Sequence, residues 1–93
     1  MTIKSFKCSD TELLFRKFRV KRLASIEIVG RRKLAMLDFA TRLDDLRSPP
    51  RNRLEALKSS RTGEHSICVN DQFRVCFVWT GQDAENVEIV DYH

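Results

Sequence analysis

The last third of the chain alternates apolar and polar positions, which is the pattern of half-buried β-strands. Residues that favour turns separate the alternating runs. The Gly81-Gln82-Asp83-Ala84 segment is the clearest of these separators. The pattern therefore predicts three consecutive strands, at residues 65–69, 73–79 and 86–90.

The pairing register of the first two strands follows from the requirement that their apolar side chains share one face. Ile67 and Phe73 lie on the same face only if the connecting loop has an odd number of residues. The loop Asn70-Asp71-Gln72 has three residues and meets this condition. We therefore predict an antiparallel meander in which Cys68 lies opposite Arg74 and Ser66 opposite Cys76.

The first twenty residues predict a short strand followed by a helix. Residues 3–6 alternate apolar and polar, as a half-buried strand does. Ser9 and Glu12 have the spacing of a capping box, with Cys8 and Leu13 placed as its hydrophobic staple. We expect the helix to begin at about Asp10.

A longer helix is predicted from about Ala24 to Leu46, because apolar residues recur there at helical spacing. Gly30 lies within the apolar face and marks either a close packing contact or a weak point. The Ser48-Pro49-Pro50 segment is expected to end the helix. The opposite side of the predicted helix is also apolar, with Ile28, Ala35, Phe39 and Leu46. We therefore expect a second element to pack against this side.

Together these elements predict an α+β fold of the order β-α-α-β-β-β, with an antiparallel sheet packed on a helical hairpin. The 93 residues are enough for one domain, spanning 1–93. No apolar run approaches the roughly 18 residues of a membrane span, and the N-terminus does not resemble a signal peptide. We expect a cytoplasmic protein with no membrane partner.

Cysteine and charge narrow the range of functions. The three cysteines have no zinc-binding spacing, so we expect reduced thiols, no metal and no cofactor. Residues 1–61 hold sixteen Lys and Arg against seven acids, whereas residues 62–93 hold one Arg against six acids. This polarity favours a polyanionic partner, with a merely soluble basic surface as the alternative. The cationic run 16–22 is either a solvated loop or a segment that orders on binding.

Candidate chemistry gathers at the end of the chain. Asp91, Tyr92 and His93 combine an acid, a phenol and an imidazole, and these are groups that ribonucleases use for proton transfer without a metal. Strict alternation places Asp91 and His93 on the core side, so the chain must bend after Val90 for them to meet a substrate. Arg74 is the one cation of the last 32 residues, and it either contacts an anion or pairs with Glu88.

Three segments, in the order in which they occur along the chain, resemble the HigB branch of the RelE and ParE toxin superfamily. The likeness begins at Ile3 and covers nearly the whole chain. Its most specific parts are Asn52-Arg53-Leu54-Glu55-Ala56-Leu57-Lys58, then the run from Gly63 through Asn70-Asp71-Gln72-Phe73-Arg74 to Trp79, and finally Val87-Glu88-Ile89-Val90-Asp91-Tyr92-His93.

The resemblance implies a ribosome-dependent endoribonuclease. Such a toxin cleaves mRNA in the A site of the 70S ribosome without a metal, and a HigA-like helix-turn-helix antitoxin suppresses it. Operator DNA is then bound only through the antitoxin complex. The reaction implied is attack of the ribose 2′-OH on the adjacent phosphorus, which leaves a 2′,3′-cyclic phosphate.

Matching positions assign roles to individual residues. His93 or Asp91 is implied in proton transfer, Tyr92 in orienting a base, and Arg74 with Lys58 in stabilising the charge of the phosphorane. Further substrate contacts are expected from Arg53, Arg61 and Glu55. Glu55 stands where other members place a second catalytic histidine, so that role is either taken by its carboxylate or lost.

Two other functions fit the same sequence. One is a non-catalytic toxin of this fold that binds another target, such as DNA gyrase. The second is a plain nucleic-acid-binding domain, against which stands the expected absence of exposed aromatic residues interleaved with the basic ones. The set formed by Arg74, Asp91, Tyr92 and His93 favours the ribonuclease.

Overall fold

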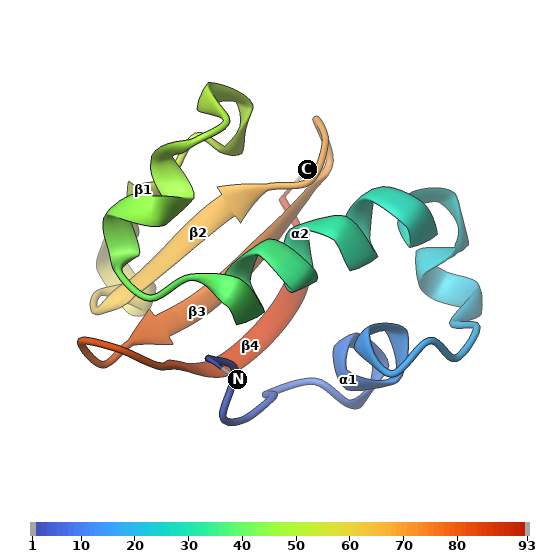
Figure 1. Ribbon diagram of the computed structural model, residues 1–93. Helices are drawn as coiled ribbons and strands as arrows, with labels where there is room; N and C mark the ends of the chain where they lie inside the picture. Colours follow the sequence, from blue (N-terminus) through green and yellow to red (C-terminus); the bar gives the residue numbers. More distant parts are fainter. Residues whose placement is uncertain (1, 93) are drawn as a thin grey trace.

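The computed structural model describes residues 2–92, in which two α-helices pack on one face of a four-stranded antiparallel sheet (Figure 1). The strand order is β1-β2-β3-β4, so sequence neighbours are also spatial neighbours. This confirms the predicted α+β class. The strands are β1 (Glu55–Ala56), β2 (Glu64–Cys68), β3 (Phe73–Trp79) and β4 (Ala84–Asp91).

The predicted register is confirmed. Cys68 pairs with Arg74 and Ser66 pairs with Cys76 across the three-residue turn. The Asn70 side chain fixes this turn, because its Oδ1 accepts hydrogen bonds from the backbone amides of Gln72 and Phe73, both at 2.8 Å. β4 is longer than predicted, and the short edge strand β1 was not predicted.

The N-terminal segment runs beside β4 but forms less strand than predicted. Two isolated parallel bridges join Ile3 to Ala84 and Phe6 to Val87. The segment also closes the end of the second helix, because the hydroxyl of Thr2 donates to the carbonyl of Ala40 at 2.6 Å. Its backbone is thus divided between the sheet edge and the helix, which limits regular pairing.

Helix α1 spans Ser9–Phe15, close to the predicted start, but the predicted capping box is wrong. Cys8 occupies the N-cap position, and no side chain caps the helix. Ser9 is already inside the helix, one residue too late to cap it. The carboxylate of Glu12 instead forms an ion pair with Arg16 at 3.0 Å.

Helix α2 spans Glu27–Phe39 and is shorter than the predicted 24–46. A 3-10 helix precedes it at Lys21–Ile26, and another follows it at Leu43–Arg47. The Asp45 carboxylate accepts hydrogen bonds from the amides of Thr41 and Arg42, which offers the backbone an alternative to a continued helix. These bonds lower the pKa of Asp45. The prediction that the prolines end this helix is therefore wrong.

The apolar face of α2 is packed, whereas its second apolar side is largely open. Gly30 is a close packing contact: a Cβ at this position would lie 3.2 Å from Leu14 and 3.7 Å from Ile89. Ile28 and Phe39 are 73% and 85% exposed, so no part of residues 2–92 covers them. The predicted second neighbour is absent at these two positions.

Three further observations concern groups that the sequence singled out. No helix within residues 2–92 has the length and apolar content needed to cross a membrane. Cys8, Cys68 and Cys76 are unbridged, and burial raises the pKa of Cys76 to about 11. In the same part of the chain, His, Cys, Asp and Glu side chains form no group of three that is able to hold a metal ion.

Candidate functional site

Arg74 is the second residue of β3 and lies on the sheet face that is turned away from the helices, near the β2–β3 turn. Its neighbours Phe73 and Val75 point into the core, so alternation along β3 places Arg74 on the opposite face. Only 11% of its side chain is exposed. Two hydrogen bonds fix the guanidinium, because Nε donates to Ser66 Oγ at 2.7 Å and Nη2 donates to the Arg53 carbonyl at 2.8 Å.

A carboxylate and a phenol flank this guanidinium. Glu55 Oε1 lies 3.4 Å from Nη2 of Arg74. The ring of Tyr92 lies below the guanidinium, with 5.8 Å from its centroid to the guanidinium carbon. The structure therefore brings together three residues that the sequence placed in the site from three separate segments.

The alternative pairing of Arg74 with Glu88 is wrong. Glu88 is bound by Arg61 at 3.1 Å and by Lys7 at 3.6 Å. Arg61 also contacts Glu64 at 3.0 Å. Burial by itself lowers the pKa of Arg61. The hydrogen bond to Glu88 and the nearby carboxylates outweigh burial, so the pKa of Arg61 is raised. This guanidinium is thus engaged by the protein itself, which favours a structural contribution.

Asp91 and Tyr92 lie beside the turn between β2 and β3, near the C-terminal end of the trace in Figure 1. β4 continues through Asp91, which pairs with Phe73, so the chain does not bend after Val90. Because opposed residues in an antiparallel pair share a face, Asp91 lies on the side of Phe73 and Tyr92 on the side of Arg74. The Asp91 carboxylate accepts a hydrogen bond from Gln72 at 3.0 Å. His93 lies outside the described residues.

Two other predicted residues come from the segment that leads into and out of β1. Arg53 reaches the site through its carbonyl oxygen, and its own side chain is exposed. Its φ of 46° places the backbone in the left-handed region at this bend. Lys58 follows β1, is exposed, and has no ion-pair partner within residues 2–92. Its ammonium is therefore available to an anion.

Sequence reasoning missed Ser66 as a site residue. Ser66 is fully buried, and its hydroxyl holds the guanidinium of Arg74. The signal was present in the register, because Ser66 is the diagonal neighbour of Arg74 once Cys68 is placed opposite it. Serine at this position serves to orient the arginine.

The arrangement suits the stabilisation of a negatively charged group more than it suits metal chemistry. A fixed guanidinium presents planar donors that match phosphate oxygens. The adjacent phenol ring offers a surface for stacking an unpaired base. The carboxylate of Glu55 adds a proton acceptor within reach of the same position.

Comparison with known proteins identifies the family of this chain. Residues 5–93 match the family described as the RelE-like toxin of type II toxin-antitoxin system HigB. Toxin HigB-1 of Vibrio cholerae serotype O1 is 46% identical over 63 residues, which cover 68% of this chain and 66% of that protein. An uncharacterized protein of Haemophilus influenzae is 38% identical over 56 residues, covering 60% of this chain and 55% of that protein. The chain belongs to the HigB-like toxin family of type II toxin-antitoxin systems.

Proposed function

We propose that this chain is a ribosome-dependent endoribonuclease that cleaves mRNA in the A site of the 70S ribosome and so inhibits translation. The observation that carries the proposal is the Arg74 guanidinium, which is fixed by two hydrogen bonds and flanked by Glu55 and Tyr92. A donor held in this way needs no reorganisation when charge develops on a phosphorane.

In the proposed reaction the ribose 2′-oxygen attacks the adjacent phosphorus and the bond to the 5′-oxygen breaks. The products are a 2′,3′-cyclic phosphate and a free 5′-hydroxyl. Arg74 stabilises the added negative charge, and Lys58 assists as a second cation. Tyr92 stacks on or orients the base beside the scissile phosphate.

Proton transfer requires one group that accepts the 2′-OH proton and one that donates a proton to the departing 5′-oxygen. The candidates at the terminus are His93 and Asp91. Glu55 stands where the resemblance implies a second histidine. Its carboxylate lies 3.4 Å from Nη2 of Arg74, beside the proposed position of the phosphate, so it is a third candidate for the proton acceptor. A Glu55→Gln variant that cleaves as fast as the parent would remove Glu55 from the mechanism.

The family implies an antitoxin partner for this chain. We propose a HigA-like helix-turn-helix antitoxin, with operator DNA bound only through the complex. The ribosome and its mRNA are the proposed substrate assembly, which places the activity in the cytoplasm. Because sixteen of the seventeen Lys and Arg lie in residues 1–61, we expect this part to contact ribosomal RNA in a salt-sensitive manner.

Primer extension on a translated mRNA tests the proposal. Purified protein is added with and without ribosomes, and the wild type is compared with a variant that lacks His93. Cleavage that requires both ribosomes and His93 is expected. Cleavage of the same mRNA without ribosomes would exclude the A-site model. Absence of cleavage together with altered DNA supercoiling would favour a gyrase-directed toxin instead.

A further inference from the structure

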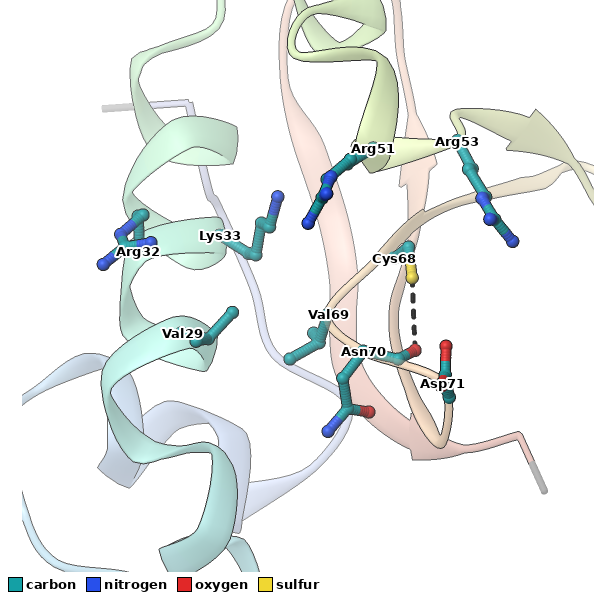
Figure 2. A pocket seen from close by; sticks show the side chains of 9 residues that line it. All are labelled: Val29, Arg32, Lys33, Arg51, Arg53, Cys68, Val69, Asn70 and Asp71. Carbon is teal, nitrogen blue, oxygen red and sulfur yellow. Dashed lines mark hydrogen bonds between the residues drawn. The ribbon is translucent and has the colours of Figure 1, made fainter.

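A second basic site lies next to Arg74, in a pocket of about 580 Å³ between α2 and the loops that flank β2 (Figure 2). Figure 2 shows Lys33 entering the pocket from α2 and Arg51 entering from the Pro50–Asn52 turn. Arg53 and Asp71 border it on the side of the β2–β3 turn. Arg32 contributes to the rim.

The cations that line this pocket form no ion pair with an acid of residues 2–92. Most other arginines within residues 2–92 are paired, for example Arg16 with Glu12 and Arg47 with Asp44. Neither Arg51 nor Arg53 forms an ion pair within that part of the chain, and one acid, Asp71, lines the pocket. A concentration of unpaired positive charge in a cavity attracts anions.

Lys33 contributes a buried positive charge to the pocket. Its ammonium is buried and donates to Asn52 Oδ1, a neutral acceptor, and no carboxylate of residues 2–92 forms an ion pair with it. Burial lowers the pKa of Lys33 below its ordinary value. An anion in the pocket would supply the charge partner that the protein leaves out.

The pocket is connected to the Arg74 site through two shared residues. Arg53 places its side chain at the pocket while its carbonyl accepts the hydrogen bond from Arg74. Cys68 lines the pocket and is the cross-strand partner of Arg74. The pocket and the Arg74 site are therefore adjacent.

We propose that this pocket binds a phosphate of single-stranded RNA that neighbours the phosphate held at Arg74. The assignment to RNA rests on the proposed function, whereas the phosphate chemistry rests on the pocket. The planar guanidinium groups of the pocket arginines match the two non-bridging oxygens of a phosphodiester, and the ammonium of Lys33 adds a positive charge at the base of the pocket. Such a contact anchors the substrate on one side of the cleaved bond and fixes its register against Arg74.

The test is an NMR titration of the protein with a 2′-O-methyl RNA trinucleotide, which lacks the attacking hydroxyl and is not cleaved. Saturable shifts are expected for the backbone amides of Arg53 and of residues 68–71. The Arg51→Gln/Arg53→Gln variant should bind at least about tenfold more weakly, because charge-assisted hydrogen bonds are lost. Arg42→Gln/Arg47→Gln is the matched control, since it removes the same two charges from side chains that are 76% and 69% exposed outside the pocket. The control should bind within about twofold of the parent.

Three results would overturn the proposal. One is the absence of pocket shifts with millimolar trinucleotide at low salt. Another is equal weakening by Arg42→Gln/Arg47→Gln, which would indicate a general effect of net charge. The third is tighter binding of an acidic peptide of matched charge, which would assign the pocket to a protein partner. Shifts at the pocket in a protein that does not cleave translated mRNA would support the phosphate site and refute the ribonuclease function. Cleavage of mRNA by a protein that shows no shifts at the pocket would support the ribonuclease function and refute the phosphate site.

Discussion

Asn52 is predicted to be the most sensitive polar residue of the segment that carries Arg53 and Glu55. It is fully buried, and its side chain forms four hydrogen bonds, one of them a long contact from Nδ2 to Met36 Sδ at 3.8 Å. Oδ1 accepts from the Lys33 ammonium, while Nδ2 donates to the carbonyls of Leu46 at 3.1 Å and Ser48 at 3.4 Å. It thereby connects α2 to the two 3-10 turns that precede β1.

The expected cost of Asn52→Ala follows from the groups left without partners. The buried ammonium of Lys33 loses a charge-assisted hydrogen bond, which contributes about 1.5–3 kcal/mol. The buried carbonyl of Leu46 loses its donor, at a cost of about 1–3 kcal/mol. We therefore expect the free energy of unfolding to fall by about 3–5 kcal/mol, measured by urea unfolding.

A double-mutant cycle with Lys33→Met separates this hydrogen bond from general packing. In the Asn52→Ala background the Lys33 ammonium is a buried charge without a partner. Removing it there recovers part of the stability that Asn52→Ala loses. Lys33→Met should therefore be less destabilising in the Asn52→Ala background than in the parent, by about 1–2 kcal/mol. A cost of Asn52→Ala below about 1 kcal/mol, or a cycle that is additive within about 0.5 kcal/mol, would refute this reasoning.

Three further predictions concern packing and reactivity. Gly30→Ala should lower the free energy of unfolding by about 1 kcal/mol in urea, because the contact with the fully buried Leu14 outweighs the gain in helix propensity; a stabilised variant would contradict it. Thr11→Val should cost about 1–3 kcal/mol in the same assay, since the Ile89 amide donates to Thr11 Oγ1 at 2.9 Å, and a smaller loss is expected for Thr11→Ser. Cys76 should be unreactive toward a thiol reagent at pH 8 in the folded protein, because burial raises the pKa of its thiol to about 11. Since the same thiol deprotonates at a lower pH in the unfolded chain, the free energy of unfolding should also fall as pH rises from about 9 to 11. Rapid labelling of Cys76 in the native protein would contradict both expectations.

The sheet was predictable because its pattern depends on local alternation and on one loop length. The three-residue turn at Asn70 fixed the register, and the register alone placed Cys68 opposite Arg74. The helices were less predictable. Where α2 ends depends on the Asp45 carboxylate and on Thr2, which lies 38 residues away from the carbonyl that it caps. Such contacts leave no signal in periodicity.

The candidate site was predictable as a set of residues but only partly as a geometry. Arg74, Tyr92 and Glu55 come together as the resemblance implied, whereas Asp91 follows the alternation of β4 on to the opposite side. Arg61 was expected at the substrate, and its two carboxylate partners became visible only with the chain folded, because Glu88 lies 27 residues away. The basic pocket was also hidden, since it joins α2 to a turn that no sequence pattern links to it.

Cleavage of translated mRNA on ribosomes by Arg74→Ala tests the central proposal most directly. Circular dichroism and urea unfolding first establish that the variant is folded, and Arg42→Gln serves as the control that removes an equal charge elsewhere. Arg74→Ala should lower the cleavage rate by roughly two to three orders of magnitude, the usual effect of losing one positioned donor. The control should remain within a few-fold of the parent. A folded Arg74→Ala protein that cleaves A-site mRNA at the parental rate would contradict the assignment of this site.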